Sequence, residues 1–464
     1  MSQETFDVVV IGAGPVGENA AARAVGGGLT AALVEHERFG GECSYWACIP
    51  SKALLRPGNL LAAARRMPGM PVGDRLDPAA VFERRDLFTG KGDDSGQVEW
   101  AAGVGIKTVR GHGRITGERK VTVDDGRVLL ARHAVVVCTG SVPKIPEIPG
   151  LAEVPIWTSR DATSSGEAPA RLAVLGGGVV GVEMAQAWAR LGAKVDLIVT
   201  GPRPLPRYPD FAGDAVAEGL RVDGVTVHLN SGLVRASEVD GAARLGLKGD
   251  VVLTADRLLV ATGRRPATDD LGLESLGLPT GRPLTVDDSG LVSEVDGGWL
   301  YAAGDVTGRA LLTHQGKYAA RVVGDVIAAK AAGRRVDARP WSRYTSTADH
   351  YAVPQVVFTD PEVTSVGLTE PVEGAPHRVV ELDIAVAGSS LHADGYAGKA
   401  RIVVDTEREV LVGATFVGQD VAELLHSATV AIVGEVPLGR LWHAVPSFPT
   451  ISEIWLRLLE TYGL

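Results

Sequence analysis

Two strand-turn-helix segments with the same glycine spacing constrain the fold more than any other feature of the sequence. The first runs from the apolar strand Val8–Ile11 into Gly12–Gly17 and an alanine-rich helix. The second runs from Leu172–Leu175 into Gly176–Gly181 and another helix from Val182. A buried strand, a G-x-G-x-x-G turn and a helix form the opening unit of a dinucleotide-binding α/β fold, with the pyrophosphate at the helix N-terminus. We therefore predict two doubly wound, Rossmann-like domains in one chain.

An acidic residue at the end of the next strand strengthens the first assignment. The first helix ends at Gly26–Gly28, and the strand Thr30–Val34 is closed by Glu35. At this place in a dinucleotide fold, an acid accepts hydrogen bonds from a ribose hydroxyl. The candidate nucleotide-binding residues of the two turns are Glu35 and the glycines Gly12, Gly14, Gly17, Gly176, Gly178 and Gly181.

The stretch Gly40–Lys52 contains two of the only three cysteines in 464 residues. In a regular helix, residues five apart have Cα atoms about 8–9 Å apart, which exceeds the roughly 7 Å that a disulfide spans. If Cys43 and Cys48 bond to each other, the segment between them must be an irregular turn leading into a helix. Pro50 favours a helix that begins near Cys48, where the helix dipole stabilises a thiolate. The alternative is a pair of buried cysteines that do not bond.

Length and composition exclude several function classes. The chain has 45% hydrophobic residues, enough for two to four domains with their own cores. A formal charge of −10 provides no basic surface for nucleic acid, and no apolar run reaches the ~18 residues of a membrane span. No further cysteine pair or histidine cluster has zinc-ligand spacing. We expect a cytoplasmic protein without nucleic-acid, membrane or metal partners.

Gly40–Lys52 resembles the motif G-G-x-C-x-x-x-x-C-x-P-[ST]-K of the class I pyridine nucleotide-disulfide oxidoreductases, the group of lipoamide dehydrogenase, glutathione reductase and mercuric reductase. The resemblance implies that the first dinucleotide unit binds FAD and the second binds NADPH or NADH. It also implies a redox-active disulfide in which Cys43 attacks the substrate and Cys48 faces the flavin. Tyr45 and Trp46 depart from the small and aliphatic residues that are usual between the cysteines.

By the same resemblance, Lys52 lies near the reactive nitrogen of the flavin and pairs with Glu183 of the second glycine-turn helix. The alternative interpretation of Glu183 is an exposed acid in the first turn of that helix, which the helix dipole favours.

Three further segments match the family in chain order. Thr139-Gly140 and Thr262-Gly263 each follow a buried strand, where the chain passes out of a nucleotide domain. Leu300–Val306 reads as a strand that ends in Gly304-Asp305. Asp305 matches the acid that accepts hydrogen bonds from the ribityl chain of FAD. Val353–Glu362 matches the entry to the C-terminal dimerisation domain, which implies a homodimer.

The family motif H-P-T-x-x-E is present near the C-terminus except that Phe448 replaces the histidine. In the family, that histidine comes from the partner subunit, is oriented by the glutamate and exchanges a proton with the interchange thiol. Glu453 therefore remains as a candidate catalytic residue without its histidine. His443 lies upstream, but a lone histidine is more often structural.

The nucleotide preference is predicted from the segment after the second strand of the second unit. Val199 occupies the position where relatives that use NADH carry an acid, so nothing there repels a 2′-phosphate. Arg203 and Arg207 follow and could bind that phosphate, which favours NADPH. The alternative is two solvated loop arginines.

These observations predict a fold and a function. We expect an FAD-binding domain at 1–152 and 271–342, an NAD(P)-binding domain at 153–270 and an α+β dimerisation domain at 343–464. The expected enzyme passes electrons from NAD(P)H through FAD to Cys43 and Cys48, and on to an unidentified small-molecule or protein disulfide. The alternative, suggested by Phe448, Tyr45 and Trp46, is a diaphorase-like reductase of quinones or dyes. A flavoprotein with only a binding role would not need the cysteine pair.

Overall fold

The computed structural model describes residues 2–464, which divide into two compact units. The first unit contains residues 2–50, 86–143 and 264–349, and the second contains 51–85, 144–263 and 350–464. Each unit is therefore assembled from three separate stretches of sequence. Among residues 2–464, no helix combines the length and the apolar composition needed to cross a membrane.

The first unit is built on a seven-stranded sheet with a parallel centre. The parallel strands are β3 (Ile106–Arg110), β2 (Ala31–Glu35), β1 (Gln3–Ile11) and β6 (Val128–Val137), in that order, and β17 (Leu300–Ala302) also pairs with β6. The antiparallel strands β5 (Lys120–Val123) and β4 (Gly113–Gly117) extend the sheet beyond β6, and β7 (Ser141–Pro143) pairs separately with β16 (Arg264–Pro266). The apolar strand residues are buried because helices or loops cover both faces.

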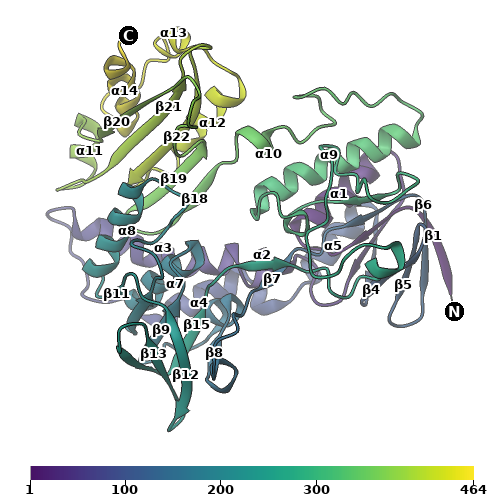
Figure 1. Ribbon diagram of the computed structural model, residues 1–464, viewed down its shortest axis with the longest axis horizontal. Coiled ribbons are helices and arrows are strands. Elements are labelled where there is room, and N and C mark those ends of the chain that lie inside the picture. The colour runs from purple at the N-terminus through teal and green to yellow at the C-terminus, as the bar shows by residue number, and fades with distance from the viewer. Residues whose placement is uncertain (1) are drawn as a thin grey trace. The chain divides into compact units, whose positions relative to one another are not determined.

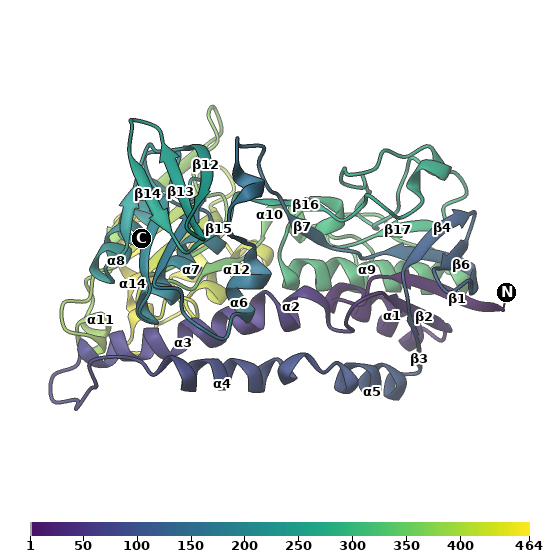
Figure 2. The same ribbon diagram turned by 90° about the horizontal axis from the view of Figure 1, so that it is seen from below.

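Two long helices of the first unit, α1 (Pro15–Gly26) and α9 (Thr313–Ala331), lie side by side (Figure 2). They approach closely because their facing residues are small. A Cβ added to Gly324 of α9 would lie 3.0 Å from the carbonyl oxygen of Ala20 and 2.6 Å from the Cβ of Arg23 in α1. The shorter α5 (Ser95–Val104) packs against α1 and β3.

The second unit contains a five-stranded parallel sheet and three helices that follow its strands. The strand order is β11 (Thr226–His228), β10 (Lys194–Ile198), β9 (Arg171–Leu175), β15 (Arg257–Val260) and β8 (Ile156–Trp157), and the helices are α6 (Ser159–Ser164), α7 (Val179–Arg190) and α8 (Asp210–Val222). The helices α3 (Cys48–Arg65) and α4 (Pro78–Phe88) each cross a boundary between the units, and their residues in the second unit pack around the buried Trp188.

The C-terminal part of the second unit is an antiparallel sheet covered by helices (Figure 1). Its strand order is β18 (Gln355–Val357), β19 (Glu362–Gly367), β22 (Val410–Gly418), β21 (Lys399–Asp405) and β20 (His377–Asp383). Helix α12 (Leu425–Val433) packs on β19 and β22, and α14 (Ile454–Tyr462) packs on β20 and β21. The short helices of this part are α11 (Ala387–His392) and α13 (Leu438–Leu441), and α10 (Ala348–Tyr351) precedes it.

The predicted fold class is confirmed: two doubly wound parallel sheets and an α+β C-terminal part are present. The residue boundaries predicted for the four segments stay predictions. A three-stranded antiparallel sheet of β12 (Leu233–Val239), β13 (Ala242–Leu247) and β14 (Val252–Ala255) was not predicted from the sequence. In the sequence, its strands lie between β11 and β15 of the dinucleotide unit. Their buried and exposed residues alternate too irregularly to show the two-residue period of a strand.

Glu362 at the start of β19 should make the stability of the protein depend on pH. Burial, reinforced by the charges of Asp420 and Asp360, raises the pKa of Glu362 from 4.5 to about 7. Between these values the folded state binds more protons than the unfolded state, so the free energy of unfolding falls as pH rises. Glu362→Gln removes this titration and keeps an oxygen for the backbone N–H of Ala422, which lies 2.9 Å from the carboxylate.

We therefore expect Glu362→Gln to gain stability relative to the wild type as pH rises from 4.5 to 7, by on the order of 2–3 kcal/mol. Urea unfolding at several pH values measures the difference. A difference that stays constant over this range would contradict the prediction. Glu407→Gln, at an exposed position of the same domain, is the control.

Candidate functional site

The first glycine turn brings the backbone of α1 against the end of β1. Gly12 has φ of 98°, and a Cβ there would lie 2.4 Å from the carbonyl oxygen of Cys138. A Cβ on Gly17 would lie 1.9 Å from the carbonyl oxygen of Gly12. Gly14 is the N-cap of α1, where no side chain caps the helix, and a Cβ there would meet nothing closer than 4.0 Å. The N-terminus of α1 is thus shaped to bind an anion such as a pyrophosphate.

Glu35 lies at the end of β2, as the sequence predicted, and is buried. Its carboxylate accepts hydrogen bonds from the backbone N–H groups of Ala13 (2.8 Å) and Glu37 (2.9 Å). Burial alone would raise the pKa of Glu35, but the hydrogen bonds from His36, Ala13 and Glu37 outweigh it and lower that pKa. An ionised acceptor beside the glycine turn fits a ribose hydroxyl.

Asp305 follows β17 and begins a short 3₁₀ helix, Asp305–Thr307. Its carboxylate accepts a hydrogen bond of 2.6 Å from the hydroxyl of Ser141. Arg264 donates to that hydroxyl (2.7 Å) and to the carbonyl oxygen of Ser141 (2.6 Å). Burial raises the pKa of Asp305, which Ser141 and Arg264 oppose. The fold thus joins Asp305 to the segment that contains Thr139 and Gly140, where the Thr139 hydroxyl donates to the carbonyl oxygen of Ala267 (2.8 Å).

The two cysteines lie on either side of a helix break. The short helix α2 (Gly41–Tyr45) carries Cys43, the chain turns at Trp46, and α3 begins at Cys48. The expected irregular turn between the cysteines is confirmed. Both are thiols in this structure, and Cys43 is hydrogen-bonded to Cys48. This hydrogen bond, burial and the charge of Cys48 raise the pKa of Cys43.

Three side chains here were not predicted from the sequence: Thr313 and Lys317, which act on the cysteines, and Glu18, which interacts with Lys317. The Thr313 hydroxyl lies 3.2 Å from the Cys48 sulfur and is hydrogen-bonded to Cys43 as well. Lys317, one turn later on α9, lowers the pKa of Cys43 through its charge. Burial raises the pKa of Glu18 on α1 to about 7, opposed by Lys317, and within the described chain its Oε1 atom is buried without a hydrogen-bond partner. The spacing of Thr313 and Lys317 on one helix face was the available signal.

The second glycine turn, in the second unit, repeats the geometry of the first. A Cβ on Gly176 (φ 118°) would lie 2.4 Å from the carbonyl oxygen of Ala261, and one on Gly181 would lie 1.9 Å from that of Gly176. Gly178 is the N-cap of α7, without a side-chain cap and with open space around it. Gly263, with φ of 120°, follows β15 beside this turn. The N-terminus of α7 therefore offers a second anion site.

Lys52 and Glu183 form an ion pair of 2.8 Å in the second unit, which the resemblance had implied. The side chain of Glu183 is only 3% exposed, so its interpretation as an exposed first-turn acid is wrong. The second carboxylate oxygen of Glu183 accepts a hydrogen bond from the backbone N–H of Phe358 (3.0 Å), and Lys52 Nζ lies 4.8 Å from the centre of the Phe358 ring.

The two candidate phosphate-binding arginines differ in their surroundings. Arg203 forms ion pairs with Asp210 (2.8 Å) and Asp214 (3.1 Å) of α8. Arg207 is exposed, and no ion pair of its side chain is found among residues 2–464. Val199 is buried after β10.

Near the C-terminus, the replacement residue Phe448 is 75% exposed, and His443 is exposed as well. One oxygen of Glu453 pairs with Arg457 (2.9 Å), and the other is buried without a partner in the described chain. No group of three potential metal ligands occurs among the described residues.

Comparison with protein families decides the identity of the chain. Residues 6–332 match the model of the pyridine nucleotide-disulphide oxidoreductases, and residues 353–458 match the dimerisation domain of that family. The chain belongs to this family. The resemblance inferred from the cysteine motif is therefore confirmed.

Relatives of the family cover nearly the whole chain. The dihydrolipoyl dehydrogenase of Chlorobaculum tepidum is 34% identical over 97% of this chain and 95% of its own length. The mercuric reductase of Staphylococcus aureus is 29% identical over 97% of this chain and 81% of its own. The Cu(II) complex of the HOCl-induced flavoprotein disulfide reductase RclA from Escherichia coli superimposes with a TM-score of 0.83, at 25% identity and 99% coverage of both chains.

Membership of the pyridine nucleotide-disulphide oxidoreductases makes the chain an oxidoreductase and implies FAD and NAD(P)H as its cofactors. The geometry of this chain fits both groups, because each glycine turn leaves an open helix N-terminus and the first unit adds the ionised Glu35 and the partly buried Asp305. The quinone alternative is not favoured, since the relatives are named as dihydrolipoyl dehydrogenases and disulfide reductases.

Proposed function

We propose that this protein is an FAD-dependent NAD(P)H:disulfide oxidoreductase whose redox centre is the pair Cys43 and Cys48. The observation that carries the proposal is the helix break between them, which holds both sulfurs within hydrogen-bond range beside Thr313. FAD, when bound at the first glycine turn, would carry electrons from NAD(P)H at the second to this pair. The domains would follow the predicted boundaries 1–152 with 271–342, 153–270 and 343–464.

The proposed disulfide reaction uses the two thiols in different roles. Cys43, as thiolate, attacks one sulfur of the substrate disulfide, forms a mixed disulfide and releases one substrate thiolate, which takes up a proton. Cys48 then attacks the Cys43 sulfur, releases the second substrate thiolate and forms the Cys43–Cys48 disulfide. One substrate disulfide is reduced and two protein thiols are oxidised. Lys52, held by Glu183, would lie beside the flavin.

Serine variants of the two cysteines test the proposal. We expect Cys43→Ser and Cys48→Ser both to lose turnover with a panel of small and protein disulfides. Cys43→Ser should show a long-wavelength thiolate-to-flavin absorption band without any reductant, because Cys48 remains as a thiolate facing the flavin. Cys48→Ser should lack the band. A Cys43→Ser protein without it at neutral pH would refute the assigned roles, and the buried Cys138→Ser serves as the control.

We propose NADPH as the preferred nucleotide, with Arg207 as the residue that binds its 2′-phosphate. Arg203 is a weaker candidate, because its guanidinium is engaged by Asp210 and Asp214. Arg207 has no such ion pair within residues 2–464, and it lies in the same loop after Val199.

Alanine variants of the two arginines test this preference. We expect Arg207→Ala to raise the KM for NADPH about 10-fold or more, since a hydrogen bond to a charged group contributes about 1.5–3 kcal/mol. The KM for NADH should stay the same. Arg203→Ala, which removes an arginine of the same loop, should change neither constant by more than about two-fold. Equal effects of Arg207→Ala on both nucleotides would contradict the proposal.

We further propose a homodimer, supported by the dimerisation-domain match of residues 353–458. In the family resemblance, the segment with Phe448 and Glu453 reaches the disulfide of the partner subunit. A phenyl ring cannot exchange the proton that the interchange thiol needs, so disulfide turnover should be slow while flavin reduction is unaffected. A cytoplasmic location without nucleic-acid or membrane partners stays a prediction.

Restoring the histidine should accelerate the disulfide half-reaction alone. We expect Phe448→His to raise turnover with small disulfides by up to about 10²-fold, because positioned acid-base groups contribute ~10²–10⁴-fold. The rate of flavin reduction by NADPH, measured by anaerobic stopped flow, should stay the same. The double variant Phe448→His/Glu453→Gln is the control and should lose most of the gain. No gain in Phe448→His would show that another group already supplies the proton.

A further inference from the structure

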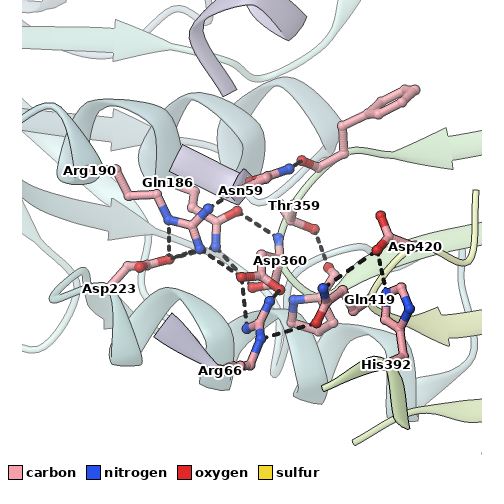
Figure 3. A network of polar contacts seen from close by, with 12 residues as sticks. Asn59, Arg66, Gln186, Arg190, Asp223, Thr359, Asp360, His392, Gln419 and Asp420 are labelled. Carbon is pink, nitrogen blue, oxygen red and sulfur yellow. Dashed lines mark hydrogen bonds and ion pairs between the residues drawn. The ribbon is translucent and has the colours of Figure 1, made fainter. Parts of the chain in front are cut away.

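A polar network in the second unit holds the short segment Phe358–Asp360, which links β18 to β19 (Figure 3). The network draws side chains from α3 and the residue after it, from α7, from the turn after α8 and from the segment after β22. Its members are Asn59, Arg66, Gln186, Arg190, Asp223, Asp360 and Gln419. All of them lie within the second unit.

One face of α7 binds the segment along its length. Glu183 accepts a hydrogen bond from the backbone N–H of Phe358 (3.0 Å). Three residues later, the amide of Gln186 accepts from the backbone N–H of Asp360 (2.8 Å) and donates to its carbonyl oxygen (3.0 Å). Arg190 donates to the Asp360 carboxylate (3.0 Å). Residues spaced in this way share a helix face, so α7 acts as a template for the segment.

Helix α3 holds the segment from a second side. Asn59 donates to the carbonyl oxygen of Phe358 (3.2 Å) and accepts a hydrogen bond from Arg190 (2.6 Å). Arg66, the residue directly after α3, binds the Asp360 carboxylate with two hydrogen bonds of 3.0 and 3.1 Å. Both backbone polar groups of Phe358 are therefore hydrogen-bonded, the N–H to α7 and the carbonyl oxygen to α3. Helix α3 also carries Lys52.

The network is buried and closely packed. Gln186 is fully buried, and the side chains of Arg190 and Asp360 are each 10% exposed. Asp223 of the turn after α8 receives hydrogen bonds from Gln186 (2.7 Å) and Arg190 (2.9 Å), so neither side chain can move independently. A Cβ on Gly219 of α8 would lie 2.4 Å from the carbonyl oxygen of Asp360. Contacts with α3, α7 and α8 thus fix the position of the segment that contains Phe358.

Phe358 contacts both members of the Lys52–Glu183 ion pair. One Glu183 oxygen binds Lys52 and the other binds the Phe358 N–H, so the carboxylate is fixed at both ends. Lys52 has a long, flexible side chain that is 35% exposed, and the Phe358 ring lies 4.8 Å from its Nζ atom. A cation over an aromatic face is attracted to it, so the ring limits where the ammonium can lie.

We propose that Phe358, held by the network of Gln186 and Arg190, is a positioning residue that sets the place of the Lys52 ammonium. Phe358 lies in the stretch 353–458 that matches the dimerisation domain of the family, so this domain also contributes to the ion pair. The inference rests on the proposed function, in which Lys52 lies beside the flavin.

A double-mutant cycle on the FAD-loaded protein tests this role. The variants are Phe358→Leu, Lys52→Met and the double variant. Phe358→Leu keeps the bulk of the side chain and the backbone N–H but removes the aromatic face. The readouts are the rate of flavin reduction by NADPH in anaerobic stopped flow and the midpoint potential of the flavin. We expect Phe358→Leu to slow flavin reduction about 3- to 30-fold, the range of a cation–π contact, and to shift the potential. Phe358→Tyr should stay within about two-fold of the wild type.

If Phe358 acts through Lys52, Phe358→Leu should change the rate by less than about two-fold in the Lys52→Met background. Equal effects in both backgrounds would overturn the positioning role. Lys52→Met tests whether Lys52 acts on the flavin: if it leaves rate and potential unchanged, the positioning role fails. The proposed function fails separately, if Cys43→Ser and Cys48→Ser keep their turnover with disulfides. If Lys52→Met has an effect but Phe358→Leu has none, the positioning role alone fails.

Two further variants separate positioning from general stability. Gln186→Leu removes the hydrogen bonds to Asp360 and should slow flavin reduction in the same direction as Phe358→Leu. Tyr396→Phe removes a partly buried hydrogen bond to the carbonyl oxygen of Gln419 (2.9 Å) and changes no contact of Lys52 or Glu183. It should lower the thermal midpoint without changing the rate of flavin reduction. A rate loss in Tyr396→Phe equal to that in Gln186→Leu would reduce the network to a stabilising role and overturn the proposal.

Discussion

The close approach of helix to strand at the two glycine turns is the constraint on which the rest of the structure depends. In each turn a Cβ on the last glycine would lie 1.9 Å from the carbonyl oxygen of the first, at Gly17 against Gly12 and at Gly181 against Gly176. No side chain larger than hydrogen fits there, and this contact sets the direction of α1 and of α7. The N-terminal N–H groups of both helices are thereby left at the ends of parallel strands, where an anionic cofactor can bind.

The first glycine turn also fixes the surroundings of the cysteine pair. A Cβ on Gly41, at the start of α2, would lie 2.7 Å from the Cα of Gly14, so the segment before Cys43 packs directly on the N-terminus of α1. Helix α9 packs on α1 and presents Thr313 to Cys48. A pyrophosphate site and a thiol pair are thus built around the same helix, which is a physical reason for the cysteine motif to follow the first turn closely in sequence.

The sequence predicted what local spacing determines, and missed what distant segments bring together. The glycine turns, Glu35 at its strand end and the helix break between Cys43 and Cys48 all follow from short-range geometry. By contrast, Thr313 meets Cys48 across 265 residues and Phe358 meets Glu183 across 175, and local spacing identifies neither partner. Lys52 and Glu183, 131 residues apart, were paired only because a family motif supplied the link.

The break between α2 and α3 gives two chemically identical residues different environments. Cys48 begins α3, where the helix dipole favours a thiolate, and the Thr313 hydroxyl lies beside its sulfur. Cys43 lies within α2, and its hydrogen bond to Cys48, burial and the charge of Cys48 raise its pKa. Lys317 opposes that effect, so a positive charge on α9 can ease the ionisation of Cys43 when it has to attack. A continuous helix through both positions would separate the sulfurs and remove this asymmetry, since only an N-terminus offers unpaired N–H groups to a thiolate.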